Sequence, residues 1–250
     1  MSTLKEPMTP PERPVAAPSG RPRRRRVLRA LSTVLIVAGT LLLADAALTL
    51  VWQEPLSAIY NRFQQDKLSG QLSDDAKGKL APTQVETRAL RTLPDARSRI
   101  AFAARALDRK IKPGQPIGRI RAKAIGLNKV VVEGTTTDVL PKGPGHYPAQ
   151  PLPGAPGTVA IAGHRTTYGA PFRHVDDFRK GDRITVEMPY AKVTYAVERL
   201  RIVQPTDTWV TRRRGYNRLV LTACHPLYSA AQRIVVFARQ VREEPSTSLF

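Results

Sequence analysis

The sequence predicts a mainly β domain, a closed barrel or a sandwich, that follows a transmembrane helix and a partly helical stalk. Three observations predict this. Short β-rich runs alternate with Gly/Pro turns between residues 117 and 241, and no long helical stretch separates them, which favours a barrel or sandwich over a βαβ fold. Apolar residues recur at helical spacing within residues 53–115. An apolar stretch near the N-terminus is long enough to span a bilayer.

The composition excludes several classes of protein. The 250 residues are 42% hydrophobic, too many for a wholly disordered chain. The single cysteine cannot form an internal disulfide or a Cys-rich zinc site. The net charge is +20, of which +5 lies in residues 1–52 and +15 in the remainder. This spread charge predicts an anionic partner, such as nucleic acid, a membrane surface or an acidic cell wall.

The N-terminal region predicts a membrane anchor. Residues 1–26 contain six prolines and end in a run of arginines, which predicts a disordered basic tail. From Leu31 to Val51 the chain is apolar for 21 residues, or about 31 Å of helix. Asp45 is its only charge, and Trp52 follows it where an interfacial aromatic residue belongs. We therefore expect a transmembrane helix over residues 27–52.

The charge around this helix predicts its orientation. The arginines precede it, so the positive-inside rule places the N-terminus in the cytoplasm and the chain after Trp52 outside. A cleavable signal peptide is the alternative, since Ala30–Leu43 fits its apolar region and Ala44-Asp45-Ala46 fits a cleavage site. Both interpretations export the rest of the chain.

Residues 53–115 are expected to form a stalk with helical segments. Two sets of apolar residues recur there at helical spacing: Leu56, Ile59, Tyr60 and Phe63, and then Ile100, Ala103, Ala104, Leu107 and Ile111. Interruptions are expected at Gly70, Gly78, Pro82 and Pro94. Pro113-Gly114 ends the segment.

The β domain is expected over residues 116–243, with a short C-terminal tail at 244–250. Its expected strands are Ile117–Ala122, Lys129–Glu133, Thr158–Gly163, Arg183–Glu187, Lys192–Val203, Arg218–Thr222 and Arg233–Val241. The Pro- and Gly-rich segment Ala149–Gly157 is expected to be a loop.

The lone cysteine is a candidate nucleophile. An unpaired thiol outside the cytoplasm is exposed to oxidation unless it is buried or used. Cys224 ends the apolar run Leu219–Ala223 and precedes His225-Pro226, which cannot continue a strand ladder. The thiol is thus expected where a buried strand meets a surface loop. The alternative is a buried, inert cysteine that acts as a small hydrophobic residue.

A thiol needs a base to become a thiolate, and the chain has four histidines. His164 follows an apolar strand and a glycine, in a position like that of Cys224, and is the first candidate. His146, in a Gly/Pro loop, is the second. His225 is adjacent to the thiol but points to the opposite face of its strand, and His174 lies in a polar stretch where solvent is expected to surround it.

Arg233 is a candidate for charge stabilisation. If the strands that end at Cys224 and begin at Arg233 form a hairpin, the two residues face each other across its open end. A guanidinium there can donate to a developing oxyanion or to a substrate carbonyl. The alternative is a strand-edge arginine that only discourages association.

These residues together resemble the sortase family. Ala160-Ile161-Ala162-Gly163-His164-Arg165 looks like the strand and catalytic histidine of that family, Leu221-Thr222-Ala223-Cys224 looks like its Thr-Leu-x-Thr-Cys signature, and Arg233 falls where its arginine falls. The resemblance runs from about Ile117 to Val241. The segments 163–172, 143–148 and 224–226 are similar to the class E enzymes of high-GC Gram-positive bacteria.

The resemblance implies an eight-stranded sortase-type β-barrel and a transpeptidase with no cofactor and no metal. Cys224 would attack the Thr–Gly bond of a C-terminal sorting signal and form a thioester, with His164 as acid and base and Arg233 at the substrate backbone and oxyanion. An amine of a lipid-linked peptidoglycan precursor would resolve the thioester. Class E also implies a signal of the Leu-Ala-x-Thr-Gly type, with Tyr147 in the loop implicated in that choice; the alternative for Tyr147 is packing on nearby prolines.

The sequence departs from the signature at two positions. Val220 replaces its first Thr, and Ala223 replaces the Thr before the cysteine, so a hydroxyl contribution to the oxyanion pocket is lost. A backbone N–H of Ala223 or its neighbours can take that role, and Thr222 and Ala223 are expected to contact substrate together with Tyr147.

Two other functions compete with this interpretation. One is a membrane-anchored basic module that binds wall polymers without catalysis. Binding to nucleic acid is not expected, since only 6% of residues are aromatic and stacking platforms are not evident. The other is a zinc hydrolase using His164, His146 and Cys224, although no two of these have a short metal-site spacing.

Overall fold

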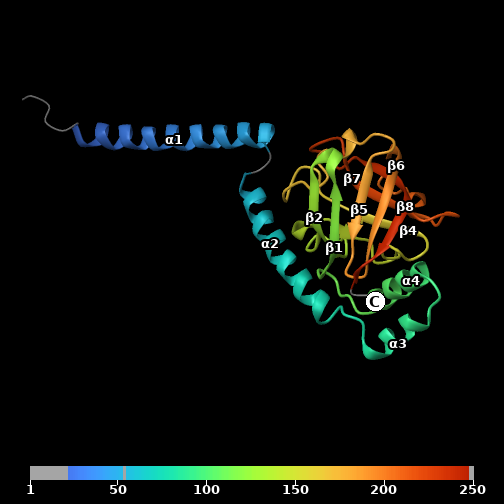
Figure 1. Cartoon of the computed structure of the whole chain (residues 1–250). Coiled ribbons are helices and arrows are strands. Elements are labelled where there is room, and N and C mark those ends of the chain that lie inside the picture. The colour runs from blue at the N-terminus through green and yellow to red at the C-terminus, as the bar shows by residue number, and fades with distance from the viewer. Residues whose placement is uncertain (1–21, 53–54, 248–250) are drawn as a thin grey trace, which may run out of the picture. The chain divides into compact units, whose positions relative to one another are not determined.

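The computed structural model describes residues 22–52 and 55–247, and its chain divides into two units, Met1–Ala47 and Leu48–Phe250 (Figure 1). Most of the predicted basic tail lies outside the described residues, as do the last three residues of the predicted C-terminal tail. The side chains of Trp52 and Leu56 also lie outside them.

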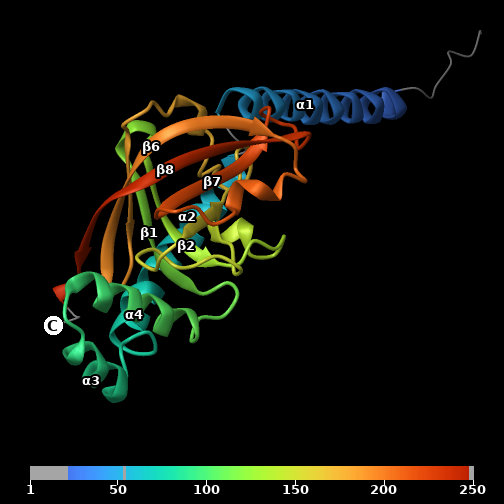
Figure 2. The same ribbon diagram turned by 90° about the vertical axis from the view of Figure 1, so that its right-hand side faces the viewer.

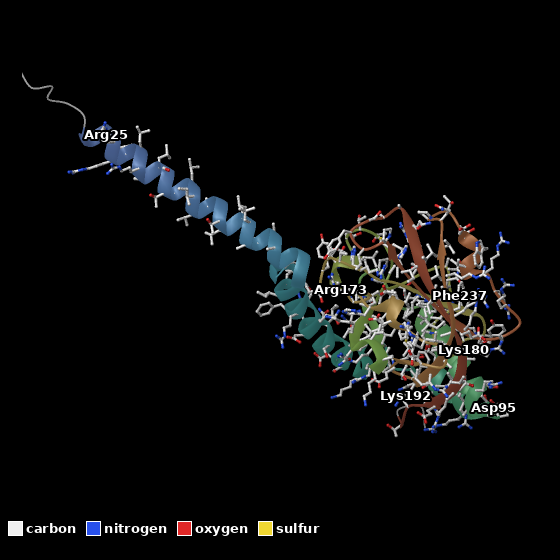
Figure 3. All side chains as sticks on the ribbon, turned by 90° about the horizontal axis from the view of Figure 1, so that it is seen from above. Arg25, Asp95, Arg173, Lys180, Lys192 and Phe237 are labelled. Atoms are coloured by element: carbon white, nitrogen blue, oxygen red, sulfur yellow. The ribbon has the colours of Figure 1, made fainter. Side chains whose placement is uncertain are left out.

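The first helix, α1 (Pro22–Trp52), has the properties of a membrane span. Its stretch Arg25–Ala47 is 23 residues long with a mean hydropathy of 2.1, and none of it is buried in the protein. Figure 3 shows the described side chains of this stretch as sticks along the α1 ribbon. A helix of this length and composition can cross a bilayer once, which is consistent with a single membrane anchor.

The β domain is a closed eight-stranded barrel, which confirms the predicted fold class. Its strands follow the order β1-β2-β3-β4-β7-β8-β6-β5 around the barrel. They are β1 (Pro116–Ala122), β2 (Leu127–Glu133), β3 (Gly145–His146), β4 (Thr158–Ala162), β5 (Arg183–Glu187), β6 (Ala191–Val203), β7 (Arg218–His225) and β8 (Gln232–Pro245). The sequence missed β3, because two residues are too few to show a period of two.

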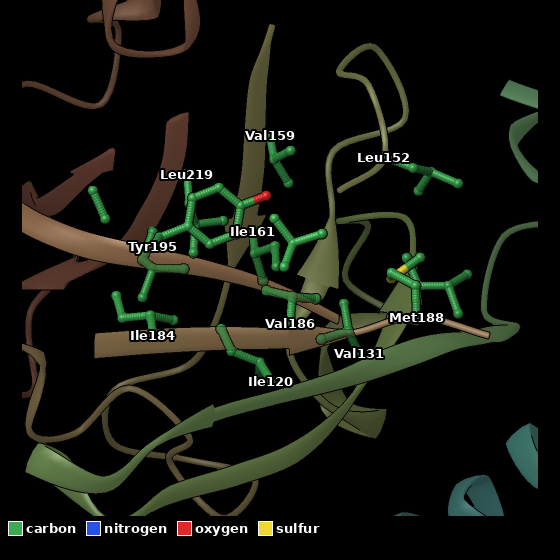
Figure 4. Packing of buried hydrophobic residues seen from close by; sticks show 14 of the residues in the cluster. Ile120, Val131, Leu152, Val159, Ile161, Ile184, Val186, Met188, Tyr195 and Leu219 are labelled. Atoms are coloured by element: carbon green, nitrogen blue, oxygen red, sulfur yellow. The ribbon is translucent and has the colours of Figure 1, made fainter. Parts of the chain in front are cut away.

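Alternating residues of each strand separate the barrel interior from its outer wall. On β7 the buried Leu219, Leu221 and Ala223 join the interior cluster, which Figure 4 shows with Tyr195, Ile161 and Ile120. The residues between them face outward, and Val220 packs with Phe237 under Trp209 in a second cluster. The outer wall of β4, β7 and β8 therefore carries its own apolar cover.

Two of the stalk helices close one end of the barrel. They are α3 (Gln84–Thr92), which begins with a capping box from Thr83 and Glu86, and α4 (Ala96–Asp108), which Asp95 caps. Ile100, Ala104 and Leu107 of α4 belong to the barrel's core cluster. Both helices lie beside the ends of β6 and β8 (Figures 1 and 2). The stalk helices thus pack on the barrel.

The second helix, α2 (Pro55–Lys77), runs beside β1 and β2. It continues through Gly70, which the sequence had predicted as an interruption; that prediction was wrong. Gly70 is exposed and has open space around it, so its cost within a helix is only about 1 kcal/mol. Packing of α2 on the barrel outweighs that cost.

Candidate active site

Cys224 lies near the end of β7, directly opposite Arg233 near the start of β8. The antiparallel register pairs the two residues as the predicted hairpin requires. The cysteine is free and half-buried, so its thiol is neither sealed in the core nor fully in solvent. This position at the rim of a rigid strand pair suits a reacting group.

His164 follows the end of β4, the strand next to β7, by two residues. β4 and β7 run parallel with Ala162 opposite Thr222, and the N–H of Gly163 donates to the carbonyl of Thr222 at 3.0 Å. His164 and Cys224 each lie two residues beyond that pair, so the parallel register places both residues at the same end of the barrel. His164, Cys224 and Arg233 therefore share one rim, across β4, β7 and β8.

The connection after His164 folds back on itself because Gly163 has no side chain. A Cβ at Gly163 would lie 2.5 Å from the ring of Phe172, which is fully buried there. The N–H of Phe172 donates to the carbonyl of His164 at 3.0 Å. The close approach of these two residues fixes the backbone that carries the imidazole.

The imidazole of His164 is half-buried, and burial favours its neutral form. Its Nδ1 lies 3.4 Å from Thr167 Oγ1, and its ring centroid is 5.0 Å from that of Tyr168. Its Nε2 is buried and has no hydrogen-bond partner among the described residues. Burial disfavours the charged form and lowers the pKa of His164 below its ordinary value of 6.5. A neutral imidazole with an unused nitrogen can accept a proton.

Arg233 rests on the β7–β8 connection. Its Nη1 donates to the carbonyls of Ala230 and Gln232, both at 2.9 Å. These carbonyls belong to the segment that joins Cys224 to Arg233. The guanidinium is therefore held at the open end of the hairpin, where its remaining N–H groups can donate elsewhere.

Two of the three predicted substrate contacts meet on the outer wall. The hydroxyl of Tyr147 lies 2.9 Å from Thr222 Oγ1, and Thr222 shares the outward face of β7 with Cys224. Ala223 differs, because its side chain is buried in the barrel's core cluster. Only its backbone can reach the site, so the Ala in place of Thr removes no outward-facing hydroxyl.

Sequence analysis missed the contribution of Arg165. This side chain is 97% buried, since its exposed fraction is 3%. Its Nη1 lies 3.1 Å from His225 Nδ1, its Nη2 lies 2.5 Å from Asp176 Oδ2, and its Nε donates to the carbonyl of Arg173 at 3.3 Å. Since a guanidinium can only donate, His225 accepts at Nδ1. Arg165, the residue after His164, thus contacts His225, the residue after Cys224.

The other two histidines have separate environments. His146, the second candidate base, is fully buried, with Nδ1 2.8 Å from Glu133 Oε2 and Nε2 3.3 Å from the carbonyl of Pro151. Both of its nitrogens are engaged, so it is a poor base for a thiol. His174 is exposed and lies 3.3 Å from Asp177. Within the described ranges, no three His, Cys, Asp or Glu side chains gather as a metal site.

Comparison with known proteins gives one consistent family. The model of the Sortase domain matches residues 120–241. Sortase D of Bacillus subtilis is 32% identical over 136 residues, which cover 53% of this chain and 67% of that protein. Sortase SrtE1 of Streptomyces coelicolor is 25% identical over 234 residues, which cover 87% of this chain but only 58% of that protein.

Solved structures agree with the family model. Sortase E from Streptomyces avermitilis is 31% identical, with a TM-score of 0.50, and the match covers 56% of this chain and 99% of that one. A Clostridium perfringens sortase D5 transpeptidase shares the fold, with a TM-score of 0.57 at 23% identity over 72% of this chain and 99% of that one. The chain belongs to the sortase family of cysteine transpeptidases.

Proposed function

We propose that this chain cleaves the Thr–Gly bond of a C-terminal sorting signal and transfers the new carboxyl end to an amine of a peptidoglycan precursor. The observation that supports this proposal is the strand register, in which Cys224 pairs with Arg233 and His164 follows the neighbouring strand β4 at the same end of the barrel.

In the first half-reaction the Cys224 sulfur bonds to the threonine carbonyl carbon and the C–N bond to glycine breaks. The thiol proton passes to His164, which then gives it to the leaving amine. The unused, buried Nε2 of a neutral His164 supports this role. Arg233, backed by the β7–β8 connection, stabilises the oxyanion together with backbone N–H groups near Ala223.

In the second half-reaction an acceptor amine attacks the thioester carbonyl, His164 takes its proton, and the sulfur leaves as the thiolate. The products are a new amide bond and the free enzyme. We propose a lipid-linked precursor as the acceptor, because the anchoring helix confines the enzyme to the membrane, and confinement raises the effective concentration of a membrane-bound substrate.

The outer wall beside Cys224 is the proposed binding surface for the signal peptide. Tyr147 and Thr222 are linked there by a 2.9 Å contact, on the face that carries the thiol. We assign Tyr147 to the second position of the signal, in Leu-Ala-x-Thr-Gly or Leu-Pro-x-Thr-Gly. The alternative, in which Tyr147 only packs on prolines, does not account for the contact between its hydroxyl and Thr222.

The proposed location is the plasma membrane of a Gram-positive bacterium. The arginine run precedes α1, which supports a cytoplasmic N-terminus and a barrel on the outer side. The net charge of +15 after residue 52 suits an anionic wall and lipid surface.

Mass spectrometry tests this proposal. The detergent-solubilised full chain is incubated with a Leu-Ala-x-Thr-Gly peptide and separately with a Leu-Pro-x-Thr-Gly peptide. We expect a thioester adduct on Cys224 and release of the glycine-led fragment, with neither in Cys224→Ala. Peptide retention and wall-polymer binding without an adduct, equal in both proteins, would favour a non-catalytic cell-wall-binding module.

A further inference from the structure

The first turns of α2 pack on the barrel through polar side chains, and Leu68 further along the helix joins an apolar cluster with residues of β2. Asn61 is 1% exposed and Gln65 is 9% exposed. Gln65 accepts from the N–H of Val130 at 2.7 Å and donates to the carbonyl of Lys142 at 2.8 Å. Asn61 accepts from Lys129 Nζ at 3.0 Å. Both buried amides therefore find hydrogen-bond partners on the barrel.

The apolar side chains of the same helix turns face away from the barrel. Ile59 is 56% exposed, Tyr60 is 50% exposed and Phe63 is 73% exposed. At about 100° per residue these three lie within one arc of about 100°, on the side opposite Asn61 and Gln65. This arrangement reverses the usual amphipathic helix of a globular domain, whose apolar stripe faces the core. We call these three residues the outward stripe.

The outward stripe is close in the chain to the membrane span. Three peptide bonds separate Trp52, the last residue of α1, from Pro55, the first residue of α2. At no more than about 3.6 Å per residue there and about 1.5 Å per residue within α2, Ile59 lies at most about 17 Å from Trp52. The stripe therefore starts within reach of the headgroup region, whatever the angle between the helices.

Charges beside the stripe favour a lipid surface over a second protein. Arg62 and Lys67 are exposed on this part of α2, with Asp66 as the only acidic residue between them. Lys67 lies one turn after Phe63 and so extends the stripe's own face. Aromatic and aliphatic side chains bordered by Lys and Arg are typical of helices that lie in an anionic membrane interface.

The buried face of α2 links this surface to the candidate active site. Gly169 lies in the connection after His164, and a Cβ added there would be 2.5 Å from Asn61 Oδ1. The Asn61 side chain thus packs directly on the backbone of Gly169. We propose that the outward stripe lies among the phospholipid headgroups and acyl-chain boundary of the bilayer that α1 enters, so that α2 holds the His164 connection next to the membrane surface.

The depth of the stripe can be measured in the full chain, reconstituted in phosphatidylcholine–phosphatidylglycerol vesicles. In a Cys224→Ala background, Phe63→Cys carries an environment-sensitive fluorophore, and Val85→Cys is the matched control because Val85 of α3 is 79% exposed. Nitroxides attached near the top of the acyl chains should quench the label at 63 several-fold more than the label at 85. Equal quenching at the two positions would overturn the proposal.

A second copy of the chain is the competing occupant. A second copy would be supported if the label at 63 is only weakly quenched and its emission changes with protein density at fixed lipid composition. That result would overturn the lipid contact. Thermal unfolding of each labelled variant confirms that the barrel is intact, so a misfolded variant is not scored. This measurement does not depend on the chemistry at Cys224.

The consequence for acceptor supply rests on the proposed function. The triple variant Ile59→Ser, Tyr60→Ser, Phe63→Ser should cleave a water-soluble signal peptide at the normal rate but transfer it at least tenfold more slowly to a lipid-linked amine in vesicles. Unchanged transfer would refute this consequence. If no variant and no wild-type protein cleaves peptide, the proposed function fails while the depth measurement still stands.

Discussion

The two faces of β7 differ in what they contact, although alternate residues of one eight-residue strand make them. The inward residues Leu219, Leu221 and Ala223 belong to the barrel core. The outward residues Thr222 and Cys224 meet Tyr147 and the rim shared with His164 and Arg233. Side-chain alternation along this strand separates the residues that stabilise the barrel from those at the candidate site, so substitutions on each face should have separable effects.

The largest effect is expected from Cys224→Ala on the outward face. Peptide cleavage and thioester formation should vanish, because Cys224 is the single cysteine of the sequence. The free energy of unfolding should change by less than about 1 kcal/mol, since the thiol is only half-buried. Urea unfolding and a peptide-cleavage assay measure the two quantities; residual cleavage above background would remove Cys224 from the mechanism.

The inward face should give the opposite result. Leu221→Ala should lower the free energy of unfolding by about 2–5 kcal/mol, because Leu221 is 1% exposed and the barrel cannot fully close the cavity. Below the new melting temperature, the remaining folded protein should still form the thioester. Denaturant titration and active-site titration at low temperature check this. A folded but inactive Leu221→Ala protein would show that the two faces are coupled.

A smaller effect is expected at Arg165, which lies behind the rim and contacts no reacting atom in the proposal. Arg165→Met leaves Asp176 and the Nδ1 of His225 without their donor, at a cost of about 1.5–3 kcal/mol, and misaligns the residues after His164 and Cys224. We expect kcat for peptide cleavage to fall more than KM changes, with partial recovery in Arg165→Lys.

Arg97→Met is the matched control for this substitution, because Arg97 is also paired with a carboxylate but its side chain is 80% exposed and lies at the other end of the barrel. It should leave kcat unchanged and cost about 0.2–1 kcal/mol of stability. Equal losses of kcat in the two variants would mean that Arg165 has no positioning role.

The smallest effect is a pH dependence that His164 contributes. Burial lowers the pKa of His164 in the folded protein below the ordinary 6.5. As the pH falls, the unfolded chain therefore protonates this histidine at a higher pH than the folded protein does. The free energy of unfolding should therefore fall as the pH drops through 6.5 and level off below the lowered pKa. His164→Gln should remove this part of the slope in pH-dependent denaturation. The acidic limb of the cleavage rate should likewise lie below pH 6.5, and a limb above it would contradict a buried, neutral imidazole.

Most of the barrel could be predicted from the sequence, because strand alternation and turn residues act locally. Seven strands appear within a few residues of their expected bounds, and the Cys224–Arg233 register follows from the length of the connection between them. The eighth strand, Gly145–His146, could not be predicted, because its two residues pair only through neighbours far along the chain.

The helical segments show where periodicity stops being informative. The spacing of Ile59, Tyr60 and Phe63 correctly predicts a helix, yet the helix buries Asn61 and Gln65 instead. Spacing does not say which face packs inward, and here the backbone of Val130 and Lys142 binds the Gln65 amide while the carbonyl of Pro141 accepts from Asn61.

By itself the sequence predicted one apolar span, a β domain, and a histidine, a cysteine and an arginine at or just beyond the ends of separate strands. Those features depend on composition and on residues close together in the chain. Only the tertiary structure decided that His146 pairs with Glu133, that Arg165 reaches His225 and that Asn61 and Gln65 of α2 pack on the barrel. Each of these contacts joins segments that folding alone brings together, and local patterns carry no information about such partners.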